Sequence, residues 1–148
     1  MDIDIVIDPS AAQLRSLVRA LAGIGAYVSR EAAEEAFAHH SMFNVVDTTS
    51  GWKVDLIIRK HRPFSEVEFG RRQAAEFEGC PLWVARVEDV MVAKLEWAKL
   101  GASARQLEDV AALRRIHSGQ LDQAYLEHWI AVLGLTAQWE QVAPGGAA

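Results

Sequence analysis

The sequence predicts an α/β (α+β) fold, in which a mixed β-sheet core is followed by a small C-terminal helical subdomain. Three observations predict this fold. Apolar strand patterns and helical patterns follow one another up to residue 86, as in a sheet covered by helices. After residue 86 only helical patterns occur. The chain has 148 residues with 51% hydrophobic and 24% charged residues, which is enough for a self-sufficient core.

We therefore expect residues 1–86 to form the α/β core and residues 87–142 to form the helical subdomain, with residues 143–148 as a tail. The tail contains a Pro-Gly-Gly segment, for which we expect no regular secondary structure. A boundary between two such halves is a common place for a ligand site. The sequence thus predicts a cleft between core and helices.

The composition excludes several classes of protein. The net charge of −5 does not favour broad nucleic-acid binding. No window of about 18 uncharged apolar residues exists for a membrane span. The N-terminus is acidic where a secretion signal would be basic. Cys80 is the single cysteine and has no internal disulfide partner, so we expect a cytoplasmic protein without a membrane partner.

The core begins with alternating strands and helices. The segment Asp2–Ile7 starts with period-two alternation and continues as an apolar strand. Leucine and valine at helical spacing predict a helix that starts after Ser10 and stops at Gly23. A short strand follows over residues 26–28, and Ser29 is placed to cap the next helix. The further expected elements are a helix over 31–38, strands over 42–46 and 52–59 that form a hairpin, a helix over 63–77, a strand over 82–85, and helices over 88–100, 103–117 and from 122 onward.

Three carboxylates carry the strongest chemical signal. Asp2 and Asp4 are two positions apart in the sequence (i and i+2), and such positions of a strand point to the same face. Asp55 interrupts an otherwise apolar strand, and a carboxylate in a buried sheet is unfavourable unless it has a partner or a function. If the two strands are neighbours, the three side chains converge and suit divalent metal ions. The alternative is an ordinary solvated strand end, because short motifs often occur by chance.

Many segments along the chain resemble a bacterial family of minimal nucleotidyltransferases in the DNA polymerase beta-like superfamily. The chain is also distantly similar to the nucleotidyltransferase toxins of abortive-infection systems. The resemblance covers the chain up to about Trp139. Its segments are Asp2-Ile3-Asp4-Ile5-Val6, Tyr27-Val28-Ser29, Glu31-Ala32, Phe43-Asn44-Val45, Lys53-Val54-Asp55-Leu56, Glu88-Asp89-Val90, Lys94-Leu95-Glu96-Trp97, Arg105-Gln106, Asp109-Val110, Leu121-Asp122, Tyr125-Leu126 and Trp129.

The resemblance implies Mg²⁺-dependent or Mn²⁺-dependent transfer of a nucleotidyl group from a nucleoside triphosphate to an acceptor hydroxyl. It implies that Asp2, Asp4 and Asp55 bind the metals and are the catalytic residues. It also implies that Lys94 contacts the triphosphate. The resemblance does not identify the acceptor, which is RNA, a protein hydroxyl or a small molecule. It does not identify the base of the nucleotide either.

Several charged residues have both a functional and a structural interpretation. Lys94 lies on the apolar face of its helix, so it either reaches the protein surface or points into the cleft toward phosphate. Arg105 and Asp109 are spaced for an ion pair within one helix. Alternatively, Asp109 orients Arg105 or Lys94 toward phosphates. Arg71 and Arg72 belong to a basic cluster that is either solvated or bound to phosphates.

The chain departs from the superfamily in one respect. Superfamily members carry a Gly-Gly or Gly-Ser motif upstream of the Asp-x-Asp pair, and its backbone amides hold the triphosphate. In the sequence that begins at Met1 no such motif precedes Asp2. We therefore expect poor metal binding and slow transfer from this chain unless an upstream segment exists. The alternative function is a catalytically inactive nucleotidyltransferase-fold protein, which acts in nucleotide binding, as a homodimer, or as a toxin–antitoxin partner.

Overall fold

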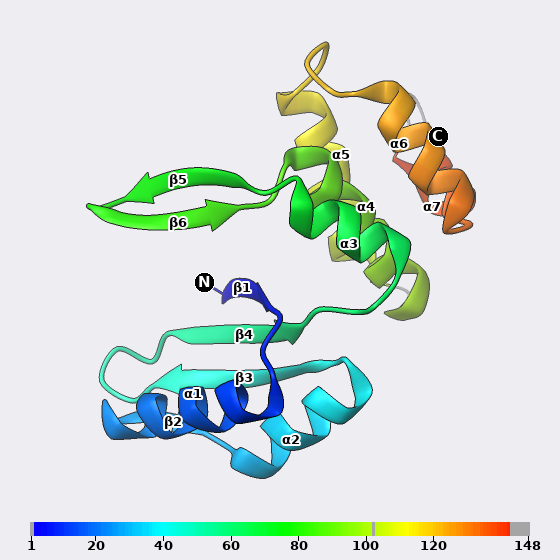
Figure 1. Cartoon of the computed structure of the whole chain (residues 1–148). Coiled ribbons are helices and arrows are strands. Elements are labelled where there is room, and N and C mark those ends of the chain that lie inside the picture. Colours follow the sequence, from blue (N-terminus) through cyan, green and yellow to red (C-terminus); the bar gives the residue numbers. More distant parts are fainter. Residues whose placement is uncertain (1, 102, 143–148) are drawn as a thin grey trace. The chain divides into compact units, whose positions relative to one another are not determined.

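The structure is a computed structural model that describes residues 2–101 and 103–142, without the side chain of Asp2. It has mixed α and β structure, as the sequence predicts: the described part contains seven helices, a four-stranded mixed sheet and a two-stranded sheet (Figure 1). The chain divides into two compact units, residues 1–65 and residues 66–148. We describe each unit by itself. The expected tail, residues 143–148, lies outside the described residues.

The first unit is a mixed sheet with two helices. Its strand order is β1-β4-β3-β2, in which β1 and β4 are parallel and the other neighbours are antiparallel. Its elements are β1 (Asp2–Ile7), α1 (Ala11–Gly23), β2 (Ala26–Val28), α2 (Arg30–His39), β3 (Met42–Asp47) and β4 (Lys53–Ile58). The expected hairpin of β3 and β4 is confirmed.

Local sequence signals explain where the two helices of this unit begin. Ser10 accepts a hydrogen bond from the Gln13 backbone amide, and the Gln13 side chain accepts one from the Ser10 amide, which is a capping box. Ser29 caps α2 through the amide of Ala32. Both helices pack on the same face of the sheet, since their buried residues form one cluster with those of β3 and β4. The buried members are Leu14, Val18, Ala33, Ala36, Phe43, Val45, Leu56 and Ile58.

The second unit is mostly helical. Helix α3 (Pro63–Gly70) spans the division between the units, and the hairpin of β5 (Gln73–Phe77) and β6 (Cys80–Val84) follows it. The remaining elements are α4 (Val87–Gly101), α5 (Ala104–Ile116), α6 (Gln123–Val132) and α7 (Thr136–Gln141). Helix α4 contacts α5, α6 and α7, and Met91, Val92 and Leu95 of α4 are completely buried. No helix in the described part of the chain is long and apolar enough to cross a membrane.

The expected helix over residues 63–77 is wrong in its second half. Helix α3 ends at Gly70, and residues 73–77 form a strand that pairs with β6. Glycine has a low helix propensity, and here it ends the helix rather than interrupting it. Glu78 and Gly79 have positive φ angles of 49° and 77° and form a two-residue hairpin turn. The hairpin belongs to the helical unit, whereas the sequence interpretation drew the boundary after residue 86.

Candidate functional site

Two of the predicted metal-binding carboxylates lie opposite each other in the sheet of the first unit. In the parallel pair of β1 and β4, Asp4 is the register partner of Asp55. Register partners on neighbouring strands point to the same face, and the strands are about 4.8 Å apart. Helices α1 and α2 pack on the face of Leu56 and Ile58, so the carboxylates lie on the other face. The sheet therefore brings Asp4 and Asp55 side by side.

Asp55 lies in a polar environment built by two neighbours. Asn44 is its register partner on β3, and the Asn44 amide nitrogen donates a hydrogen bond to Asp55 Oδ1. Lys53 Nζ lies 3.3 Å from Oδ1 and 3.5 Å from Oδ2 of the same carboxylate. Asp55 is only 8% exposed, which is tolerable for a carboxylate because both oxygens have partners. Asp55 is thus held in place by Asn44 on β3 and by Lys53 on its own strand.

The third predicted ligand, Asp2, is described by its backbone alone. The Asp2 backbone pairs in register with Lys53. Among the side chains that the structure describes, no group of three or more His, Cys, Asp or Glu residues is arranged to hold a metal ion. The pair of Asp4 and Asp55 still suits Mg²⁺, which is usually bound by one or two carboxylates together with water and substrate phosphates.

The predicted phosphate-binding residues lie in the second unit. Lys94 Nζ on α4 is 2.6 Å from Asp109 Oδ2 and 3.2 Å from Gln106 Oε1 on α5. Asp109 therefore contacts Lys94 rather than forming the ion pair with Arg105 that the i, i+4 spacing favours. Arg105 is exposed at the start of α5. The structure brings Lys94 and Asp109 together, and the expectation that Lys94 lines a cleft stays a prediction.

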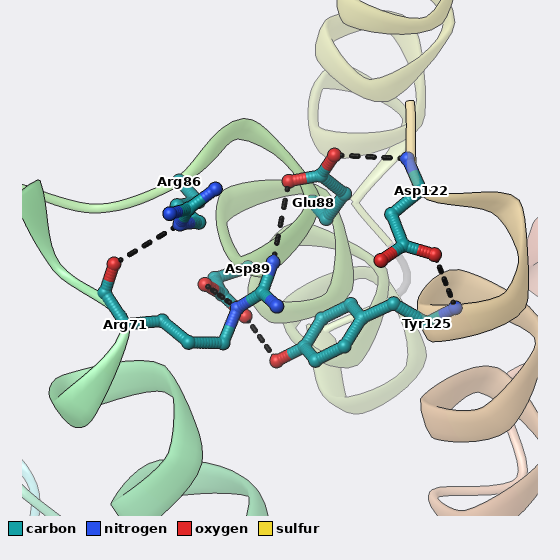
Figure 2. Close-up of polar contacts among 6 residues, drawn as sticks. All are labelled: Arg71, Arg86, Glu88, Asp89, Asp122 and Tyr125. Carbon is teal, nitrogen blue, oxygen red and sulfur yellow. Dashed lines mark hydrogen bonds and ion pairs between the residues drawn. The ribbon is translucent and has the colours of Figure 1, made fainter. Parts of the chain in front are cut away.

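Sequence reasoning missed a second polar cluster, which Figure 2 shows. It centres on Asp89 of α4, whose side chain is completely buried. Arg71 Nε is 3.2 Å from Asp89 Oδ2, and the hydroxyl of Tyr125 on α6 donates to Asp89 Oδ1. The Arg71 guanidinium also stacks on the Tyr125 ring, 3.7 Å from its centroid, and lies 3.6 Å from Glu88 Oε2. Arg71, interpreted from sequence as a solvated or phosphate-binding cation, is instead a partner of buried acids.

Burial changes the protonation behaviour of this cluster. Burial raises the pKa of Asp89, and the opposing effects of the Tyr125 hydroxyl and the Arg71 guanidinium do not offset it. Burial and the hydrogen bond to Asp89 raise the pKa of Tyr125. Glu88 is held differently, because its Oε1 accepts a hydrogen bond from the backbone amide of Asp122 at 3.0 Å, just before α6. The cluster links the end of α3, the start of α4 and the start of α6.

A sequence signal for this cluster exists in the spacing of α4. Asp89 precedes the buried Val92 by three residues, which is helical spacing, so it occupies a core position of the helix. A carboxylate at such a position needs a buried cationic or hydrogen-bonding partner. The partner itself was not predictable from spacing, because Arg71 and Tyr125 come from separate elements.

No known protein family and no curated protein matches the chain. The resemblance to nucleotidyltransferases therefore stays a prediction from the sequence. The arrangement of Asp4 and Asp55 adds a geometric argument that is independent of it.

Proposed function

We propose that the protein is nucleotidyltransferase-like and transfers a nucleotidyl group from a nucleoside triphosphate to an acceptor hydroxyl in a Mg²⁺-dependent reaction. The observation that carries the proposal is the register pairing of Asp4 with Asp55 on one sheet face. The proposal includes a cytoplasmic location, which the single cysteine favours. RNA and protein hydroxyls are the acceptor classes that we propose first.

Two carboxylates on register partners repel each other, and a divalent cation between them relieves this repulsion. Carboxylate oxygens are the ligands that Mg²⁺ prefers, and the remaining ligands would come from water, from Asp2 and from the triphosphate. Asn44 restrains the Asp55 carboxylate through its hydrogen bond, so the ligand is already oriented before a metal binds.

The reaction assigns a role to each residue. The acceptor hydroxyl oxygen forms a bond to the α-phosphorus, the bond from that phosphorus to the bridging oxygen breaks, and pyrophosphate leaves with the electron pair. Asp55 accepts the hydroxyl proton. Lys94 and Arg105 bind phosphate oxygens, and Asp109 orients Lys94 through their 2.6 Å contact. A bound Mg²⁺ would supply charge neutralisation for the phosphates.

One observation favours the second candidate function, a nucleotidyltransferase-fold protein without catalytic activity. Lys53 places a cation of the chain itself on Asp55. If Lys53 stays there, the carboxylate is already neutralised, and the protein acts in nucleotide binding or as a toxin–antitoxin partner. The active enzyme, by contrast, requires a metal ion to displace Lys53 from Asp55. The Lys53 side chain is 42% exposed, so it can move into solvent when a metal ion binds.

Titration with Mn²⁺, followed by water-proton relaxation, tests the metal site directly. We expect Asp55→Asn to weaken Mn²⁺ binding by more than about tenfold, because even outer-shell partners of a metal site contribute that much. Lys53→Gln should tighten binding by removing the competing cation. Glu35→Gln is the matched control, since Glu35 is an exposed acid on α2. Equal Mn²⁺ binding by the wild type and Asp55→Asn would contradict the proposal.

Turnover separates the two candidate functions. The protein is incubated with each labelled nucleoside triphosphate, Mg²⁺ or Mn²⁺ and total RNA or protein. We expect slow labelling of one acceptor class, since no Gly-Gly or Gly-Ser motif precedes Asp2, and we expect the label to disappear with Asp4→Asn. Metal binding that depends on Asp55 without any labelled acceptor would favour the inactive alternative.

A further inference from the structure

The hairpin of β5 and β6 is an exposed ribbon that extends away from α4 and α5 of its unit (Figure 1). Nearly all its residues are exposed, and three of them are large and apolar: Phe77 is 66% exposed, Trp83 is 63% exposed and Val84 is 40% exposed. A two-stranded ribbon alone is at best marginally stable in water. The edge of such a ribbon carries unpaired backbone groups, to which another strand can add.

The two edges of the hairpin differ in their ability to pair. The two-residue turn makes Phe77 and Cys80 a hydrogen-bonded pair, and alternation then directs the amides of positions 74, 76, 81 and 83 outward. On β6, Pro81 has no backbone N–H to donate, which disfavours pairing of this edge with another strand. On β5, Ala74 and Glu76 both present an amide and a carbonyl. The edge of β5 is therefore the one that can accept another strand.

We propose that β5 pairs with β5 of a second copy of the chain, antiparallel and centred on Ala75, to form a four-stranded sheet across a homodimer. In this register Ala75 lies opposite Ala75 of the partner subunit. Ala74 lies opposite Glu76 and Gln73 lies opposite Phe77, so every residue of β5 is paired. The outward amides and carbonyls of Ala74 and Glu76 then bond to each other on both sides of the two-fold axis.

The sequence of β5 favours a second copy over a different partner. Centring on Ala75 keeps the acidic side chains of the two copies apart, whereas centring on Glu76 would place like charges opposite each other. Two alanines near the axis allow the backbones to approach closely. Phe77 gains a neighbour, because it lies diagonally across from Ala75 of the second copy. The strand can thus pair with a second copy of itself without placing like charges opposite each other.

The base of the hairpin is fixed, so little ordering is needed for docking. Arg86 Nε donates to the Arg71 carbonyl oxygen at 3.2 Å, which closes the ribbon where it leaves the helices. The Arg72 guanidinium lies over the rings of Phe69 and Trp83, 4.1 Å and 5.1 Å from their centroids. Arg71 is anchored to Asp89 and Tyr125 (Figure 2). A surface held in its bound conformation binds with a smaller entropic cost.

Charge substitutions at the axis test the register. Sedimentation equilibrium should show a monomer–dimer equilibrium for the wild type. Ala74→Glu places like charges opposite each other twice, and we expect dimerisation to weaken by about tenfold. Adding Glu76→Lys to that variant should restore the dimer, and Ala74→Lys alone should not weaken it. A wild-type monomer at high micromolar concentration, or a dimer insensitive to Ala74→Glu, would overturn the proposal.

Cysteine cross-linking gives an independent readout. Cys80 is exposed and is first changed to serine, so that it cannot form a disulfide. In this background, Ala75→Cys should form an interchain disulfide under mild oxidation, because paired Cβ atoms across the axis are about 4.5–5.5 Å apart. Ala74→Cys is the matched control and should not cross-link, since its opposite residue is Glu76. Equal cross-linking of both variants would contradict the register, and circular dichroism checks that each variant is folded.

Discussion

The buried carboxylate of Asp89 depends on contacts of different kinds. Arg71 Nε lies 3.2 Å from Asp89 Oδ2 and forms an ion pair with it, and the Tyr125 hydroxyl donates a hydrogen bond to Asp89 Oδ1. The Arg71 guanidinium keeps one planar face on the Tyr125 ring while its edge contacts the carboxylate. Lysine cannot make both contacts, because its ammonium is a point charge. Lysine therefore cannot replace arginine at position 71 without losing one of these contacts.

The ionisation of Tyr125 makes the free energy of unfolding depend on pH. Its pKa is raised in the folded protein, whereas in the unfolded chain a tyrosine ionises near pH 10. The stability that Tyr125 contributes is therefore complete below about pH 10 and is lost as the pH rises toward the folded value. We expect the free energy of unfolding to fall above pH 10 by up to about 1.4 kcal/mol per pH unit more in the wild type than in Tyr125→Phe.

Urea unfolding between pH 8 and pH 11 measures this difference. At pH 8, Tyr125→Phe should already cost about 1–3 kcal/mol, because Asp89 loses a donor in a buried place. Tyr27→Phe is the matched control, since Tyr27 is the other of the two tyrosines and is exposed. Parallel pH profiles of the wild type and Tyr125→Phe would show that the Asp89 contact does not restrain Tyr125.

At the scale of elements, local signals predicted the first unit well. Period-two and apolar runs marked β1 and β4, and serines marked the starts of α1 and α2. The site was predictable in part, because a lone aspartate in an apolar strand stands out. The pairing of β1 with β4 was not predictable, since it joins segments far apart in the chain.

The strand expected over residues 82–85 corresponds to β6, but its partner β5, and with it the hairpin, was missed for a local reason. Its turn places Glu78 at a positive φ angle, which is uncommon for residues other than glycine, asparagine and aspartate. An Asn-Gly or Asp-Gly pair would have indicated the hairpin, whereas Glu-Gly did not. The spacing of Phe64, Val67 and Phe69, followed by Arg71 and Arg72, then extended the helix prediction too far.

Two glycines near this hairpin test the conformational argument. Gly79 has φ of 77° and Gly70 has no positive φ, and in both cases an added Cβ would meet open space. We expect Gly79→Ala to destabilise the turn by about 1–2 kcal/mol, because alanine is strained in the left-handed region. Gly70→Ala should be neutral or stabilising by up to about 1 kcal/mol.

Hydrogen exchange of the amides of residues 73–84 measures both changes. Faster exchange in Gly79→Ala with unchanged exchange in Gly70→Ala would agree with the structure. An equal effect of the two substitutions would mean that contacts, and not φ, decide the cost of a side chain at Gly79.

At the scale of the whole molecule, the described residues form two cores. One lies between the sheet and helices α1 and α2, and the other lies among α4, α5, α6 and α7. The division after residue 65 separates them, so each core stabilises its own unit. The carboxylate pair belongs to the first unit, and the Asp89 cluster belongs to the second.

Core truncations test whether the units unfold separately. Leu56 in β4 and Leu126 in α6 are buried, and replacing either leucine with alanine should cost about 2–5 kcal/mol in its own unit. We expect Leu56→Ala to accelerate amide exchange in residues 2–65 and Leu126→Ala to accelerate it in residues 66–142. Acceleration of both units by either variant would show that the chain unfolds as one cooperative unit.

The same two variants connect stability to the metal site. Leu56 directly follows Asp55 and packs on the opposite face of β4, so a cavity there loosens the strand that presents the carboxylate. We expect Leu56→Ala to weaken Mn²⁺ binding, while Leu126→Ala leaves it unchanged below its unfolding temperature. If Leu126→Ala weakens Mn²⁺ binding as much, the second unit contributes ligands or support to the metal, and the carboxylates of the sheet alone do not account for the site.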